Sequence, residues 1–189
     1  MVFRDRLEPL PKAQEAPDPI IVDPIRLVAI DLDGTLLRSD KKLSRKCAQT
    51  IAKATQRGGH IVLASAPPPR SVGEIYQLLG LETLSISYNG ALIHDLPRRK
   101  HVFHRPIDVE LANRIVKFAR KIDPDVAISA EILDKWYTDY VDPNLPTETS
   151  KRFNPDKVGS LEAYMDVPVS NLIVLARPAR LGKVVERVE

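Results

Sequence analysis

Three short strand-like segments, each separated from the next by a helix-like segment, constrain the fold of this chain more than any other feature. They are residues 27–30 and 61–64, which are continuous apolar runs, and residues 84–87. Continuous apolar runs without polar alternation are typical of strands that are buried on both faces of a parallel sheet. The order of the segments predicts a β-α-β-α-β unit with right-handed crossovers, and therefore a doubly wound α/β sheet with helices on both faces.

The two intervening segments carry the signals of helix ends. Ser44 is the expected N-cap of the first helix, and Gly58 with Gly59 is its stop signal. Ser71 and Glu74 have the spacing of a capping box, which predicts that the second helix begins at this point. Ligands of doubly wound sheets bind at the carboxyl ends of the strands, so the residues after each apolar run are candidates for a site.

Two aspartates follow the first run directly. In extended chain, Asp31 and Asp33 would point to the same side about 6 to 7 Å apart, where two carboxylates repel by about 2 to 3 kcal/mol at an effective dielectric near 20. Either both stay solvated in an acidic turn, or a positive group lies between them. Carboxylates suit Mg²⁺, whereas the amides of Gly34 and Thr35 and the hydroxyl of Ser65 suit a phosphate group. The set favours a site for a metal ion and a phosphate.

These residues resemble the haloacid dehalogenase superfamily, in its Cof-type branch of phosphatases. The segment DLDGTLL resembles the first motif of the superfamily, and IVLASAPPPRSV with ISYNGALI resembles the corresponding later segments of that branch. The resemblance implies that Asp31 is a nucleophile that forms an aspartyl-phosphate and that Asp33 is the general acid and then the base. It also implies that Mg²⁺ is held by the carboxylate of Asp31 and the main-chain carbonyl of Asp33, and that Ser65 binds the phosphoryl group.

On this resemblance, the chain is a Mg²⁺-dependent phosphatase of a small phosphorylated metabolite. Residues 25–91 are expected to form the first half of an α/β core, and residues 92–189 an incomplete α/β cap. Asn89 and Gly90 lie at the junction between the two. As an Asn-Gly pair they predict a hairpin turn, and contact with the substrate is the alternative role.

The chain also departs from the family pattern. The branch has an arginine near position 67, whereas three prolines precede Arg70 here, which predicts a stiffer loop and a displaced positive charge. The lysine of the third motif and the acidic cluster of the fourth are not recognisable after Ile93, and Lys151, Lys157 and Lys183 are interpreted as surface residues. We therefore expect an interrupted core.

An interrupted core has two consequences. The first strand would be left unpaired along one edge, which would allow the chain to associate with itself through that edge. The activity would also be in question, so the alternative function is a non-catalytic Mg²⁺- or phosphate-binding remnant of such an enzyme.

The second half of the chain predicts one strand, one helix and a further sheet. Residues 97–106 alternate basic and apolar side chains, as an exposed edge strand does, and an anion-attracting surface is the alternative. Asp108 is the expected cap of a helix. This helix is expected to cover a sheet made of residues 126–130, 135–141 and 171–176, and residues 142–157 are expected to form a loop. The apolar positions of the helix are Leu111, Ile115, Phe118, Ala119 and Ile122. The aromatic residues Trp136, Tyr137 and Tyr140 are expected either to pack under the cap or to line a sugar-sized pocket.

Composition excludes several classes of protein. The net charge of +3 is too small to imply a nucleic-acid partner. The single cysteine, Cys47, cannot form an internal disulfide and fits a reducing compartment. No apolar run approaches the roughly 20 residues of a membrane span, and the proline-rich residues 1–24 predict a flexible leader without the apolar core of a signal peptide. We expect no membrane association and a cytoplasmic location.

Overall fold

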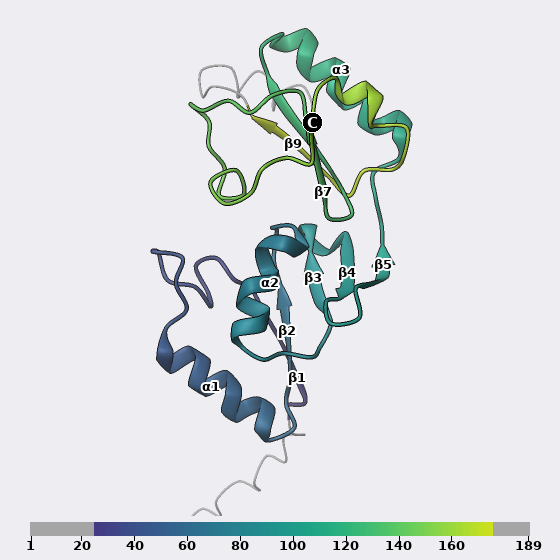
Figure 1. The fold of residues 1–189 in the computed structure, drawn as a ribbon. Coiled ribbons are helices and arrows are strands. Elements are labelled where there is room, and N and C mark those ends of the chain that lie inside the picture. Colours follow the sequence, from purple (N-terminus) through teal and green to yellow (C-terminus); the bar gives the residue numbers. More distant parts are fainter. Residues whose placement is uncertain (1–24, 176–189) are drawn as a thin grey trace, which may run out of the picture.

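The computed structural model describes residues 25–175, which form two sheets (Figure 1). The first sheet has five strands in the order β1-β2-β3-β4-β5, and the second has four in the order β8-β7-β6-β9. None of the helices in residues 25–175 has the length and apolarity that a membrane crossing requires. The leader expected at residues 1–24, Lys183 and residue 176 of the last predicted strand lie outside the described residues.

The first sheet begins with the alternating strands and helices that the sequence predicted. The elements are β1 (Leu27–Ile30), α1 (Arg45–Gln56), β2 (His60–Ala64), α2 (Pro69–Leu78) and β3 (Ser85–Ser87). β1 pairs with β2 and β2 with β3, both in parallel. Ser44 caps α1 as expected, since its hydroxyl accepts the N–H of Cys47 at 3.1 Å. The predicted α/β class with a parallel sheet is therefore confirmed.

The start of α2 differs from the prediction. The helix begins at Pro69, and Pro68 takes the N-cap position without a side-chain cap bond, so the predicted capping box at Ser71 is wrong. Proline suits the first helical turn because it lacks an amide hydrogen and has a fixed φ near −65°. The prolines that appear in the sequence as a stiff loop therefore start the helix three residues early, with the N-cap at position 68 and not at 71. This start places Arg70 in the first turn of α2.

Both crossover helices pack on the same face of the first sheet, whereas the sequence predicted helices on both faces. One hydrophobic core joins α1, α2 and β2 through Ile51, Ile61, Leu63, Val72 and Tyr76. Right-handed crossovers that step in the same direction along a sheet bring their helices to one face. β1 lies at the edge of the sheet, with Leu27 57% and Val28 40% exposed. The burial predicted for β1 is therefore wrong within the described part of the chain, but its unpaired edge is as expected.

The first sheet continues past β3 with antiparallel strands. β4 (Leu92–Asp95) pairs with β3, and β5 (Lys100–His104) pairs with β4. The turn between β3 and β4 contains Asn89 at φ 53°, so the Asn-Gly pair forms the predicted hairpin turn. β5 is an exposed outer strand, as its basic residues predicted. The sheet thus extends to His104, past the boundary that the sequence suggested between residues 91 and 92.

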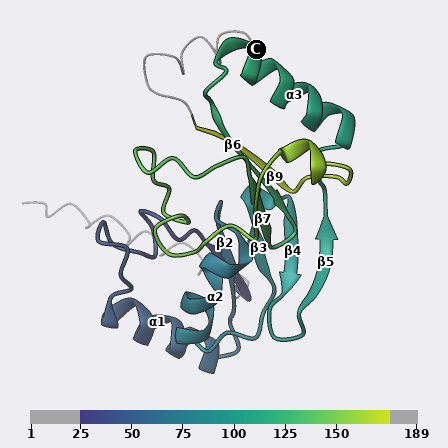
Figure 2. The ribbon, with the colours of Figure 1, turned by 45° about the horizontal axis from the view of Figure 1, so that its top comes forward.

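The second sheet carries one helix, α3 (Val109–Ile122), on the side away from the first sheet (Figures 1 and 2). Its strands are β6 (Ala127–Ile132), β7 (Lys135–Thr138), β8 (Lys157–Val158) and β9 (Asn171–Leu175). β8 was not predicted, because two residues within a polar loop carry no strand pattern. Asp108 caps α3 as expected, accepting the N–H of Leu111 at 2.8 Å.

The buried stripe of α3 differs from the predicted apolar face. The helix buries Ala112, Val116 and Ala119, whereas Leu111 is exposed. Two small alanines let the helix lie close to the sheet, and the larger Ile115 and Phe118 are only partly buried. The helical spacing of the buried residues was therefore predicted correctly, but the buried face is centred on other positions than those predicted.

Candidate functional site

A hollow at the carboxyl ends of the parallel strands brings together most of the predicted site residues. Its lining residues are Asp31, Asp33, Ala64, Ser65, Ala66, Pro67, Ile86, Asn89 and Gly90. They come from the ends of β1, β2 and β3 and the loops that follow, at the edge where ligands of such sheets bind. We call this place the Asp31 hollow. Its volume of about 530 Å³ is in the range of small-molecule sites.

Asp33 forms an ion pair with a lysine that the sequence reasoning missed. Lys41 Nζ lies 2.9 Å from Asp33 Oδ1, and both side chains are about half exposed. The hydrogen bond to Asp33 raises the pKa of Lys41, so the ammonium stays charged. The chain returns toward Asp33 through a tight turn in which the N–H of Lys41 donates to the carbonyl of Arg38 at 2.9 Å. This turn brings a positive charge beside Asp33.

Gly34 and Thr35 form the turn after Asp33 and are not among the residues that line the Asp31 hollow. Gly34 has φ +75°, a backbone conformation that glycine adopts without steric cost. The N–H of Thr35 donates to the carbonyl of Leu32 at 3.4 Å, a long hydrogen bond. The amide of Thr35 is thus engaged within the turn, whereas the sequence reasoning took it to be free for a phosphate.

Ser65 and Asn89 are held at one rim of the hollow by backbone bonds. The N–H of Ser65 donates to the carbonyl of Ile86 at 3.0 Å, and the N–H of Asn89 donates to the carbonyl of Ser65 at 3.4 Å. Ser65 is buried, and these bonds fix its backbone at the rim of the hollow. Asn89 has a positive φ, which asparagine tolerates better than most residues.

The donors available to a metal ion at the hollow are the carboxylates of Asp31 and Asp33. Across residues 25–175, no group of three or more His, Cys, Asp or Glu side chains is placed to hold a metal ion. Mg²⁺ is usually bound by one or two carboxylates, with water and phosphate oxygens completing its shell. The two carboxylates therefore fit Mg²⁺ together with a phosphate group and do not fit an all-protein metal cage.

A second polar cluster lies between the two sheets, and sequence reasoning did not predict it. Arg70 Nη2 donates to both carboxylate oxygens of Glu131, at 2.7 and 2.6 Å, and Arg70 Nη1 donates to the main-chain carbonyl of Asp134 at 2.8 Å. The hydroxyl of Tyr88 donates to Glu131 Oε2 at 3.2 Å. We call Arg70, Tyr88, Glu131 and Asp134 the Arg70 cluster. Burial raises the pKa values of Glu131 and Tyr88, and the guanidinium of Arg70 opposes both shifts.

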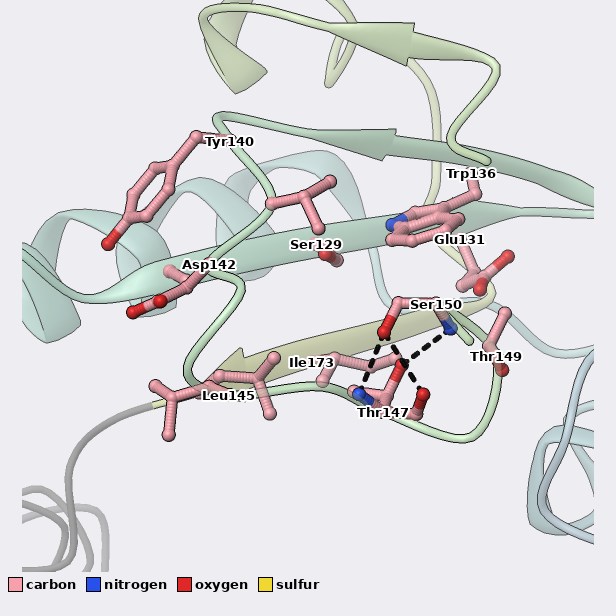
Figure 3. A pocket seen from close by; sticks show the side chains of 13 residues that line it. Ser129, Glu131, Trp136, Tyr140, Asp142, Leu145, Thr147, Thr149, Ser150 and Ile173 are labelled. Atoms are coloured by element: carbon pink, nitrogen blue, oxygen red, sulfur yellow. Dashed lines mark hydrogen bonds between the residues drawn. The ribbon is translucent and has the colours of Figure 1, made fainter. Parts of the chain in front are cut away.

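A narrow pocket lies on the face of the second sheet opposite α3 (Figure 3). Trp136 and Tyr140 line it, and Thr147 and Ser150 close one side through hydrogen bonds from each backbone N–H to the other's hydroxyl, at 2.8 and 3.0 Å. The cavity volume of this pocket is about 20 Å³, enough for one water molecule. The pocket as it stands is therefore too small for a sugar.

The three aromatic residues that sequence reasoning grouped together lie on two faces of the second sheet. Tyr137 follows Trp136 directly, and successive residues of a strand point to opposite faces. Tyr137 packs against Tyr164, with ring centroids 5.1 Å apart, on the side of the α3 core. The expected aromatic packing therefore holds for Tyr137, whereas Trp136 and Tyr140 line the narrow pocket.

The chain matches the family model of the haloacid dehalogenase-like hydrolases over residues 28–189. It is 27% identical over 153 residues to the 5-amino-6-(5-phospho-D-ribitylamino)uracil phosphatase YitU of Bacillus subtilis, covering 80% of this chain and 56% of that protein. It is 36% identical over 94 residues to the phosphatase YwpJ of the same organism, covering 50% of this chain and 33% of that protein. The matches thus span about half or less of the length of these relatives.

Solved structures share the fold. A haloacid dehalogenase-like hydrolase from Bacteroides thetaiotaomicron superposes with a TM-score of 0.76 at 20% identity, covering 87% of this chain and 63% of that chain. The protein TM0651 from Thermotoga maritima superposes with a TM-score of 0.69 at 23% identity, covering 86% of this chain and 61% of that chain. At these identities the likeness concerns the fold and does not extend to the reaction.

Proposed function

This chain belongs to the haloacid dehalogenase-like hydrolase family, and we propose that it carries the reacting carboxylates of a Mg²⁺-dependent phosphatase of small phosphorylated metabolites. The observation that supports this most strongly is the Asp31 hollow, where Asp31, Asp33 and the hydroxyl of Ser65 line one site. The printed names of the relatives support hydrolysis of phosphate esters, since YitU is named for a phosphorylated ribitylamino uracil and YwpJ as a phosphatase.

In the proposed reaction, a carboxylate oxygen of Asp31 attacks the phosphorus atom of the substrate, and the bond to the leaving alcohol breaks. Asp33 gives its proton to the leaving oxygen, so that the product departs as a neutral alcohol. Water then attacks the phosphorus of the acyl phosphate on Asp31, Asp33 takes a proton from that water, and inorganic phosphate leaves with Asp31 restored.

The other residues of the hollow position the phosphoryl group. Ser65 is proposed to donate its hydroxyl to a phosphoryl oxygen, and Asn89 and Gly90 to border the substrate. The carboxylate of Asp31 and the main-chain carbonyl of Asp33 would hold Mg²⁺, which supplies positive charge to the phosphoryl oxygens when it is bound. Thr35 is proposed to shape the turn, because it donates its amide within it, and the amide of Gly34 is proposed to donate to the phosphoryl group. We retain the cytoplasm as the proposed location on the ground of the single Cys47.

Hydrolysis of a generic phosphate ester tests the proposal. In a chain that also carries the lysine and the acidic cluster of the family, Mg²⁺-dependent release of phosphate from p-nitrophenyl phosphate is expected and should disappear on chelation. Asp31→Asn should abolish the release because an amide is a poor nucleophile, and Asp33→Asn should reduce it strongly because the leaving oxygen is no longer protonated. Calorimetry with Mg²⁺ and phosphate accompanies the assay. Heat of binding without any product would contradict the proposal and favour a non-catalytic binding protein.

A further inference from the structure

The displaced arginine of the sequence, Arg70, forms the densest polar link between the two sheets. Besides its bonds to Glu131 and to the carbonyl of Asp134, Arg70 Nη1 donates to Asp134 Oδ1 at 3.1 Å, and the backbone N–H of Arg70 donates to the same oxygen at 3.1 Å. The side chains of Arg70 and Glu131 are only 14% and 1% exposed. A planar guanidinium that donates in a fork gives both strength and direction to such a contact.

Both residues on the first-sheet side of the Arg70 cluster follow or precede segments that border the Asp31 hollow: Arg70 lies in the first turn of α2, and Tyr88 in the turn after β3. Arg70 stands three residues after Pro67, and Tyr88 directly precedes Asn89; Pro67 and Asn89 both line the hollow. Tyr88 also donates its hydroxyl to the carbonyl of Leu133 at 2.5 Å. The segments after β2 and β3 are therefore each tied to the second sheet by one side chain.

The receiving side of the cluster is the turn between β6 and β7, and it is fixed from within the second sheet. Leu133 has φ 57°, which is unusual for a residue with a branched side chain and persists where its surroundings hold it. Its N–H donates to the hydroxyl of Ser170 at 2.7 Å, and the N–H of Ser170 donates to the carbonyl of Glu131 at 2.8 Å. The turn is thus a rigid partner for Arg70 and Tyr88.

We propose that Arg70 is a positioning residue that, together with Tyr88, holds the β6–β7 turn beside the segments that border the Asp31 hollow and so limits the space left for the leaving group of the substrate. Glu131 also lines the narrow pocket, which lies on the face of the second sheet opposite α3. The Arg70 cluster therefore connects that pocket with the segments that border the hollow. The predicted effect of Arg70 on the choice of leaving group rests on the proposed phosphatase function. The predicted role of Arg70 in linking the two sheets, which we call the clamp, does not depend on that function.

Hydrogen exchange measures the link without any need for activity. In Arg70→Met, the amides of the first turn of α2 and of the β6–β7 turn should exchange at least about tenfold faster than in the parent, and in Arg70→Lys the increase should be smaller because charge remains without the fork. Arg98→Met is the matched control. Arg98 pairs with Asp95 within the first sheet, so its loss should leave both segments unchanged.

A double variant separates loss of the clamp from the burial of an unpaired carboxylate. In Arg70→Met with Glu131→Met, no buried carboxylate is left without its cation, but the contacts of the guanidinium are still absent. The clamp predicts that fast exchange persists in the double variant. Exchange that returns to the parent rate in the double variant, or that stays within about twofold of the parent in Arg70→Met, would overturn the proposal.

Measurements of phosphatase activity, in the chain that also carries the lysine and the acidic cluster, provide the second test of the proposal. Arg70→Met should lower kcat/KM for p-nitrophenyl phosphate by about tenfold or more, mainly through KM, and should change kcat/KM for acetyl phosphate, with its small leaving group, by less than about threefold. Equal losses for both compounds would contradict the assigned role toward the leaving group. A parent chain that hydrolyses neither compound would refute the proposed function, and the exchange arm would still decide on the clamp.

Discussion

Lys41 Nζ lies 2.9 Å from Asp33 Oδ1, in the segment that follows the first strand. The two aspartates after β1 would repel each other at close range, and the lysine places a positive charge beside one of them. Because a metal ion held by the Asp31 carboxylate would lie beside the same pair of aspartates, Lys41 and Mg²⁺ would be two cations at one acidic site.

Removal of this lysine should strengthen the binding of Mg²⁺. Lys41→Met is expected to lower the Kd for Mg²⁺ by about threefold to tenfold at low ionic strength, because a like charge is removed from the site, and the gain should shrink as salt screens it. Calorimetric titration of the parent and the variant measures the change. Lys42→Met, at the exposed neighbouring position, is the control, and an equal gain there would show that only net charge matters.

The exposed edge of β1 should mediate self-association. Unpaired backbone groups along an apolar strand favour pairing with another chain, and an inserted lysine opposes it. Val28→Lys is therefore expected to shift sedimentation velocity profiles from associated species toward the monomer. Val102→Lys on the other outer strand, β5, whose neighbours are already charged, should leave the profile unchanged. A parent that is monomeric at every concentration would refute this role of the edge.

The free energy of unfolding should fall as the pH drops below about 7, through His94. His94 is buried, and burial lowers its pKa, with His101 adding to the shift and Asp134 and Asp95 opposing it. The unfolded chain therefore takes up a proton near pH 6.5, before the folded chain does. Stability is lost between this value and the lower pKa of the folded state, by at most about 1.4 kcal/mol per pH unit.

Urea unfolding at pH 7.5, 6.5 and 5.5 measures this loss. His94→Gln should show a smaller decrease than the parent, because the buried titrating group is gone. The same substitution at the exposed His60 controls for the loss of an imidazole. An undiminished decrease in His94→Gln would assign the pH dependence to other groups.

The hydroxyl of Ser65 should matter for activity and little for folding. Ser65→Ala is expected to reduce kcat/KM by about 10- to 100-fold, since a hydrogen bond to a charged group contributes about 1.5 to 3 kcal/mol. Ser65→Thr keeps the hydroxyl and should retain most of the activity. Thermal unfolding of both variants should stay near the parent value, and full activity of Ser65→Ala would remove Ser65 from the proposed site.

The sequence allowed the succession of the first three strands and their two helices to be predicted, because apolar runs and the cap at Ser44 are local signals. It also placed Asp31, Asp33 and Ser65 together, since the carboxyl ends of parallel strands meet at one edge. The pairing of Lys41 with Asp33 was not predictable, because it depends on a turn that brings the chain back toward β1.

The contacts of Arg70 could not be predicted from sequence patterns. Its partners Glu131 and Asp134 are 61 and 64 positions away, and pairing between the sheets leaves no periodic signal. The exposure of β1 was missed for a related reason, since an apolar run indicates a preference for burial and does not tell which elements lie beside it.

The most direct test of the central claim is to trap the phosphoryl group on Asp31. The parent and Asp33→Asn are incubated with acetyl phosphate and Mg²⁺, quenched in acid and digested, and the peptides are analysed by mass spectrometry. We predict one added phosphoryl group on Asp31, at higher occupancy in Asp33→Asn because the water is no longer activated, and none in Asp31→Asn. Release of phosphate without any label on Asp31, or a label that persists in Asp31→Asn, would contradict the account.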